Sequence, residues 1–233
     1  MRKYLIINAD DFGASTGINR GILECHTRGV VTSTSLMVTG RAVAEAVSMS
    51  RDCPGLGVGL HWDVWGEEDE CGFDIDNVAA VREEFHRQLE EFERLLGRMP
   101  THVDSHRHAH VRAELLPVFR ELLEPLRLPL RYDSQVRCVD SFYAQWEWLV
   151  TDLEHVSVPF LQRLLQEQVD GGWTEFLCHP GYVSPDFTSV YLTEREAELR
   201  TLTDSRIRGT IVEEGISLVS YADYLRTVQI NGA

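Results

Sequence analysis

Five side chains of types that bind metal ions lie within one short stretch of the sequence. His102, Asp104, His106, His108 and His110 occupy alternate positions among nine residues. Because successive side chains of an extended backbone point to opposite faces, a strand here would project the first three together. Imidazole and carboxylate groups are ligands that divalent cations prefer. The stretch indicates either a metal centre or a solvated, histidine-rich loop without a ligand.

Polar residues at the ends of other apolar runs favour the metal centre. Asp10 and Asp11 follow the apolar run at 4–8, His61 ends another run, and His179 follows a late one. Taken singly, these could be a helix cap, a core histidine and a turn residue. In parallel α/β folds, however, active sites gather at the carboxyl ends of strands. Their coincidence at several strand ends predicts one shared site.

These residue types together are suited to the hydrolysis of an amide or ester. Two histidines and one carboxylate can hold a divalent cation and leave positions open for water and substrate. The cation polarises a carbonyl group and lowers the pKa of water. A neighbouring carboxylate can accept the proton of the water, and a histidine that is cationic near neutral pH can protonate a leaving amine. Such a site is open to Zn, Mg, Mn or Co.

The elements that would position these groups are apolar runs alternating with helical patterns, which is typical of βα units on a parallel sheet. The expected strands cover residues 4–8, 32–38, 56–61, 101–105, 128–132, 175–179 and 216–219. The expected helices cover residues 16–28, 41–51, 78–96, 115–126, 158–169, 193–203, 207–214 and 221–228. Residues 67–76 read as an acidic loop, and residues 134–156 have no clear period. About seven units without a linker predict an α/β fold forming one domain over residues 1–233.

Charge and composition argue against several classes of partner. The 233 residues include 22 Lys and Arg against 37 Asp and Glu, a formal net charge of -15. Such a charge repels nucleic acids and anionic membrane surfaces. The loop after the first expected strand has neither a G-x-G-x-x-G nor a Walker motif, which argues against a nucleotide-binding fold.

Cysteine usage and apolar runs indicate a cytoplasmic protein. The five cysteines contain no C-x-x-C pair, so neither a disulfide framework nor a zinc ribbon is indicated. The first apolar run is too short for a secretion signal, and no run has the length of a membrane span. We therefore expect no membrane partner.

Five motifs give the chain a family resemblance. LIINADDFG (residues 5–13), VTSTS (31–35), GLH (59–61), PTHVDSH (100–106) and CHPG (178–181) resemble, in order and spacing, the motifs of the YdjC-like carbohydrate deacetylase family. The resemblance covers nearly the whole chain. It implies a deformed (β/α) barrel with a mostly parallel sheet of about seven strands. It also implies removal of N-acetyl groups from amino sugars, with chito-oligosaccharides as the best-known substrates.

The resemblance also implies roles for individual residues. Asp11, His61 and His106 match the ligands of one divalent ion, with Mg or Zn as the foremost candidates. Asp10 matches the general base, and His179 matches the acid. The implied partner is a small N-acetylated sugar, and the resemblance suggests a homodimer.

Four further residues are candidates for binding or supporting the substrate. Arg131 and Glu175 stand where the family often has an arginine and an acidic residue near the site, in supporting roles. His108 is a candidate substrate contact from the histidine-rich stretch. Trp62, in a segment that departs from the family pattern, could stack on a sugar ring or pack in the core.

Two other functions remain open from the sequence. The H-x-H of His106 and His108 also occurs in other metal-dependent amidohydrolases and in phosphoesterases, although these usually carry it on the first strand. The chain could also be a sugar- or metal-binding relative without catalysis. The pair Asp10 and Asp11 argues against the second alternative, because a binding protein needs no base beside a ligand.

Overall fold

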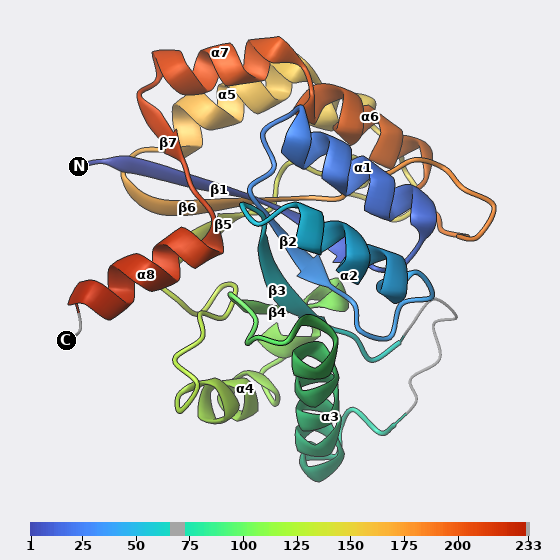
Figure 1. Cartoon of the computed structure of the whole chain (residues 1–233). Helices are drawn as coiled ribbons and strands as arrows, with labels where there is room; N and C mark the ends of the chain where they lie inside the picture. Colours follow the sequence, from blue (N-terminus) through green and yellow to red (C-terminus); the bar gives the residue numbers. More distant parts are fainter. Residues whose placement is uncertain (66–72, 232–233) are drawn as a thin grey trace.

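A parallel β-sheet curled into a half-barrel forms the centre of the protein, seen here in a computed structural model (Figure 1). The structure describes residues 1–65 and 73–231. Within these ranges the strands are β1 (Lys3–Phe12), β2 (Ser33–Leu36), β3 (Gly57–Trp62), β4 (Val103–Ser105), β5 (Val136–Val139), β6 (Gly172–Cys178) and β7 (Ile216–Leu218). The expected α/β class and deformed barrel are confirmed. Most of the expected acidic loop at 67–76 lies outside the described residues.

Strand β1 is central because it is apolar and buried along most of its length. The strand order is β4-β3-β2-β1-β6-β5, and β7 pairs with the beginning of β1. Every pairing between strands is parallel. The carboxyl ends of the strands therefore open on the same side of the half-barrel, where parallel α/β folds place their ligands.

The expected strand at 128–132 is wrong, and the true strand β5 lies in the segment whose sequence has no clear period. Residues 128–132 form only a single bridge, between Leu130 and Val103. Two causes prevent a strand there. Pro129 has no N–H to donate to a ladder. The backbone also takes a left-handed conformation at Arg127 (φ 53°) and Tyr132 (φ 62°), on either side of the bridge.

Helices pack on the outside of the half-barrel. They are α1 (Thr16–Thr27), α2 (Val43–Asp52), α3 (Val78–Leu96), α4 (Leu116–Leu123), α5 (Val158–Gln168), α6 (Thr193–Leu202), α7 (Ser205–Glu213) and α8 (Tyr221–Asn231). Two short 3₁₀ segments are η1 (His106–Val111) and η2 (Leu153–Val156). Figure 1 shows α1, α5, α6 and α7 grouped together, with α3 and α4 on the other side of the sheet. Among the described residues, no helix combines the length and apolar character that crossing a bilayer requires.

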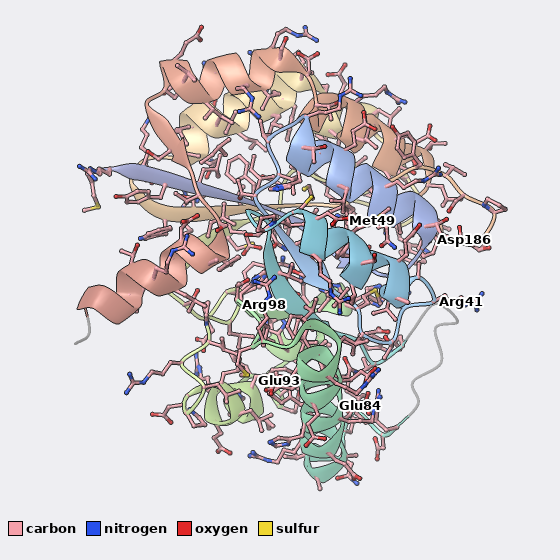
Figure 2. All side chains as sticks on the ribbon, in the orientation of Figure 1. Arg41, Met49, Glu84, Glu93, Arg98 and Asp186 are labelled. Carbon is pink, nitrogen blue, oxygen red and sulfur yellow. The ribbon has the colours of Figure 1, made fainter. Side chains whose placement is uncertain are left out.

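Two side chains hold the first turn of α1, which follows directly after β1. The Ser15 hydroxyl accepts from the backbone N–H of Ile18 at the start of α1. Asp186, labelled in Figure 2, lies in the segment after β6 and accepts from the N–H of Thr16 (2.9 Å). This contact ties the segment after β6 to the first turn of α1, next to the end of β1.

Candidate active site

A cleft of about 430 Å³ lies at the carboxyl ends of the strands. Side chains from β1, β3 and β6 border it, together with residues of η1, which directly follows β4. Six of the residues singled out from the sequence are among those bordering it: Asp10, Asp11, His61, His106, His108 and His179. The position of these polar residues at the ends of expected strands therefore identified side chains that the fold brings together.

Asp11 is a buried carboxylate held between a histidine and an arginine. Its Oδ1 lies 3.3 Å from Nε2 of His61, and its Oδ2 accepts from Nη2 of Arg195 (2.5 Å). Burial alone would raise the pKa of Asp11, but Arg195 together with the neighbouring histidines holds it well below its ordinary value. Asp11 is thus ionised at neutral pH.

His61 presents one nitrogen to Asp11 and the other to Asp104. Nδ1 of His61 lies 2.6 Å from Oδ1 of Asp104, so Nε2 is the nitrogen that meets Asp11. Burial opposes protonation of His61, yet Asp104, Asp11 and Asp10 hold its pKa well above its ordinary value. If Nδ1 carries the proton, the lone pair of Nε2 faces a carboxylate oxygen. This arrangement is stable only with a positive charge between them, either a second proton or a cation.

His106 completes the histidine pair on this side of the cleft. Its ring centroid is 5.9 Å from that of His61, and its Nδ1 lies 3.1 Å from Oδ1 of Asp63. The ring is partly exposed, whereas Asp63 is buried. Each histidine therefore has a carboxylate on Nδ1, which leaves Nε2 as the nitrogen for another ligand.

Arg131 is completely enclosed by carboxylates beneath the cleft. It donates to both oxygens of Asp10 (2.7 Å each) and to Oε1 of Glu175 (3.0 and 2.8 Å), and its Nη2 lies 2.7 Å from Oδ2 of Asp104. Asn8 gives Asp10 a further hydrogen bond (2.8 Å). Burial would raise the pKa of Asp10, but Arg131 lowers it below its ordinary value. Asp10 is therefore an ionised carboxylate in a fixed orientation.

One group of possible ligand atoms in the described part of the chain is compact enough for a metal ion, and it includes His61. Asp10, His61 and Asp104 have donor atoms that all lie within 4.8 Å of one another, which is close enough for a metal ion. Their oxygens, however, already bind the guanidinium of Arg131, and Ser35 donates to Oδ2 of Asp104 (2.6 Å). Asp11, His61 and His106, the ligands that the family resemblance implies, border the cleft together. In the described part of the chain, however, their three donor atoms do not gather as closely as those of Asp10, His61 and Asp104.

His179 borders the same cleft from the end of β6. Its backbone N–H donates to Glu198, and its Nδ1 is buried with no hydrogen-bond partner among the described residues. Burial lowers the pKa of His179 to about 4, despite the attraction of Asp11 and Asp10. This direction is opposite to the expectation of a histidine that is cationic near neutral pH, because burial outweighs the two carboxylates and Arg195 opposes them as well.

The four candidates for substrate contact divide into one that borders the cleft and three that do not. His108 borders it. Trp62 is wrong as a sugar contact, because its side chain is completely buried in the core and packs edge-on against Phe119 (ring centroids 4.9 Å apart). Arg131 and Glu175 are buried as well, and Glu175 accepts a hydrogen bond from the Tyr221 hydroxyl (2.7 Å). Their partners are protein side chains, in keeping with a supporting role.

The sequence did not reveal several residues that border or support the site. Arg195 comes from α6, and Tyr143 and Trp148 come from the segment without a clear period. Asp63 supports His106 from just beyond β3. Aromatic residues crowded into an uninterpretable segment were the one available signal for Tyr143 and Trp148. Arg195 had none, since it lies in a charged helix far along the chain from Asp11.

Comparison with families and relatives gives a consistent match over most of the chain. A family model described as YdjC-like protein matches residues 4–213. A chitooligosaccharide deacetylase from Serratia marcescens is 34% identical, covering 96% of this chain and 100% of its own length. A carbohydrate deacetylase from Geobacillus stearothermophilus is also 34% identical, covering 97% of this chain and 100% of its own length.

Solved structures share the fold. A crystal structure from Enterococcus faecalis V583, described as that of a candidate cellobiose-phosphate cleavage protein, superposes with a TM-score of 0.84 at 28% identity. That match covers 96% of this chain and 99% of the other. A family 4 carbohydrate esterase from Streptomyces lividans, in complex with acetate, gives a TM-score of 0.57 at 18% identity. It covers 94% of this chain and 91% of its own, and it supports the similarity of fold alone.

Proposed function

This chain belongs to the YdjC-like protein family, and from that membership we propose that it is a metal-dependent carbohydrate deacetylase. Its substrate would be an amino sugar or oligosaccharide that carries an N-acetyl group. Full-length relatives with deacetylase names support the reaction class. The observation that carries the proposal is the close approach of Asp11 Oδ1 to His61 Nε2. These two atoms are 3.3 Å apart in a cleft that the carboxylate of Asp10 also borders.

The residues that would hold one divalent ion, Mg or Zn, are Asp11, His61 and His106. Their donor chemistry, one carboxylate and two imidazoles, fits such an ion. Asp104 and Asp63 orient the two rings by contacts to Nδ1, as carboxylates commonly do behind histidine ligands. When bound, the ion would supply polarisation of the acetamide carbonyl and a lowered pKa for water.

Asp10 and His179 would move the protons of the reaction. Asp10 is ionised and fixed by Arg131, so a carboxylate oxygen can accept a proton from the attacking water. The water oxygen then bonds to the acetyl carbon, and the bond from this carbon to the amide nitrogen breaks. Because the pKa of His179 is about 4, His179 is neutral beforehand. It would take up one proton from solvent and deliver it to the departing amine, while Asp10 releases to solvent the proton that it accepted.

The remaining candidates have lesser roles in this proposal. His108 would contact the sugar, since it borders the cleft and its Nδ1 is buried without a partner among the described residues. Arg131 and Glu175 would support Asp10 from below. Neither needs to touch the substrate for the reaction to proceed.

Acetate release from defined sugars tests the proposed function against its alternatives. The protein is freed of metal with a chelator, reconstituted with Mg or Zn, and assayed with N-acetylglucosamine and its β-1,4-linked oligomers. We expect metal-dependent release of acetate and none of phosphate from para-nitrophenyl phosphate. Phosphate release alone would assign a phosphoesterase. Sugar binding without either product would assign a non-catalytic relative.

A further inference from the structure

A tryptophan at the outer boundary of the cleft lies largely in solvent. Trp148 is 76% exposed, yet it borders the same cleft as the buried carboxylates of Asp10 and Asp11. It belongs to the segment between β5 and η2. An exposed indole is a large apolar surface left in water, and exposed apolar surface beside a pocket is typical of a binding site.

The turn that presents Trp148 is strained. The N–H of Val150 donates to the carbonyl of Glu147 (3.0 Å), so Trp148 and Leu149 are the two central residues of a turn. Leu149 has φ 62°, at a position that favours glycine. Its own side chain is 58% exposed, so burial of Leu149 does not offset the strain. Strain of this kind is concentrated at functional sites.

The base of this turn is nevertheless firmly held against the cleft. The N–H of Asp152 donates to the carbonyl of Ala144 (2.8 Å), and the N–H of Ala144 donates to the hydroxyl of Tyr191 (3.0 Å). Gln145 donates through Nε2 to the carbonyl of Val190 (2.8 Å). Tyr191 and Val190 themselves border the cleft. The indole is therefore presented by a segment anchored to the wall of the site.

A second tryptophan in the same segment shows what a structural role looks like. Trp146 stacks on His155, with ring centroids 3.9 Å apart and planes 5° apart, and it also meets Phe160. In the described part of the chain, no ring stacks on Trp148. The protein therefore uses the indole of Trp146 for its own packing and leaves the indole of Trp148 available to a ligand.

We propose that Trp148 is the residue that stacks on a second sugar ring, so that this side chain sets how strongly the site prefers an oligosaccharide over a monosaccharide. This inference rests on the proposed function, which places the acetylated ring beside Asp10 and Asp11. A pyranose ring carries C–H groups on its faces and hydroxyls on its rim. Its face matches the indole, while Asp140 and Ser189, which also border the cleft, can meet the hydroxyls.

The test compares Trp148→Ala with Trp146→Ala on sugars of different length. Deacetylation of N-acetylglucosamine and of its trimer is measured, and calorimetry measures the binding of glucosamine and its trimer, which carry no acetyl group to remove. Trp148→Ala should lower kcat/KM for the trimer, and weaken trimer binding, by about tenfold. The loss for the monosaccharide should be smaller, and Trp148→Phe should retain most of the trimer preference. Trp146→Ala should lower the melting temperature and leave the trimer preference unchanged.

Each other outcome has a defined meaning. Equal losses on monosaccharide and trimer, or no trimer binding by the wild type, would overturn the stacking role of Trp148. A change in oligomeric state on Trp148→Ala without a change in sugar binding would overturn it too, and would assign the indole to contact with a second copy. If the wild type releases no acetate but binds the trimer through Trp148, the proposed function fails and the stacking role stands.

Discussion

Asp10 and Asp11 are neighbours in the sequence but have different partners in the fold. The backbone of Asp11 is left-handed (φ 69°), so the two carboxylates face different surroundings. Arg131 binds both oxygens of Asp10, whereas Arg195 binds one oxygen of Asp11 and leaves the other beside His61. The difference supports one aspartate as a base and the other as a ligand.

Replacing each aspartate by asparagine should separate these roles. Asp11→Asn should lose metal and activity together, because an amide is a poor ligand for the ion. Asp10→Asn should keep the metal, yet lose about a hundredfold to ten-thousandfold in turnover, because an amide accepts no proton from water. Metal content by elemental analysis and acetate release measure the two effects. Turnover of Asp10→Asn within a few-fold of the wild type would require another base.

Asp104 should affect the metal through His61. Asp104→Asn weakens the contact that fixes His61 Nδ1, and the loss of such a partner typically lowers metal affinity by about ten- to a hundredfold. Glu175→Gln is the matched control, because Glu175 also pairs with Arg131 but has no contact with His61. Competition with a fluorescent chelator measures both affinities. Equal losses in the two variants would show that charge around Arg131, and not the orientation of His61, is responsible.

Replacing His179 should reduce hydrolysis most for substrates whose leaving group needs a proton to depart. An amine leaves only when protonated, whereas para-nitrophenolate leaves without a proton. His179→Ala should therefore lose most hydrolysis of an N-acetyl sugar and much less of para-nitrophenyl acetate, with metal content and melting temperature unchanged. Equal losses on amide and ester would assign His179 to stabilising the transition state.

For single residues, the sequence identified the polar side chains near strand ends but did not predict contacts between residues that are distant in the chain. Asp10, Asp11, His61, His106 and His179 all border one cleft, because parallel strands end on the same side. The prediction that Trp62 contacts the sugar was wrong because strand β3 is buried on both faces. Alternation along such a strand does not distinguish core residues from those that face a cleft. Arg195 reaches Asp11 across the fold, and no local pattern encodes that contact.

Elements with strong periodicity were predictable, whereas short ones were not. The apolar stripe of α3 predicted its bounds of residues 78–96, and Phe85 and Phe92 are buried as that stripe requires. Strand β5 has four residues, one of them the exposed Arg137, and therefore gives no apolar run. Its pairing with β6 is a tertiary effect that overrides a weak local preference.

Two glycines in different elements should respond oppositely to alanine. In β3, a Cβ on Gly59 would overlap the ring of His102, which is completely buried and stacked on Tyr221 with ring centroids 3.9 Å apart. Gly59→Ala should cost about 1–3 kcal/mol in the free energy of unfolding. In α7, a Cβ on Gly209 meets nothing within 4 Å, so Gly209→Ala should stabilise by about 0.5–1 kcal/mol. Urea unfolding measures both, and a tolerated Gly59→Ala would mean that the His102 ring can shift.

The closure of the whole half-barrel was the least predictable feature. Strands β4 and β5 are the two ends of the strand order, and residues 129–131 lie against β4 through hydrogen bonds between Val103 and the segment. Arg131 then joins carboxylates from β1, β4 and β6 in one buried cluster. The sequence placed Arg131 near the site, but the convergence of three carboxylates on it depends on how the sheet curls.

Removing the charge of Arg131 should therefore change how the stability of the whole protein depends on pH. In the wild type, the pKa of Asp10 is lowered mainly by Arg131 against the effect of burial, so its contribution to stability is present above pH 3.8 and is lost as the pH falls further. In Arg131→Met, burial loses its main opponent. The folded-state pKa of Asp10 should then rise above its unfolded value, and that of Glu175, which burial already raises in the wild type, should rise further. The folded variant then binds more protons than the unfolded chain, so its stability falls as the pH rises.

Arg131→Met should cost about 3–5 kcal/mol at neutral pH, because it leaves buried carboxylates without their cation. The difference from the wild type should shrink at pH 5 and widen at pH 8, as measured by urea unfolding at each pH. Arg131→Lys, which keeps the charge, should lie between the two. Arg120→Met, which removes an exposed partner of Asp133, is the control and should show little change over this range. A difference between Arg131→Met and the wild type that stays constant from pH 5 to pH 8 would contradict the account, because it would mean that the carboxylates around Arg131 do not depend on it for their ionisation.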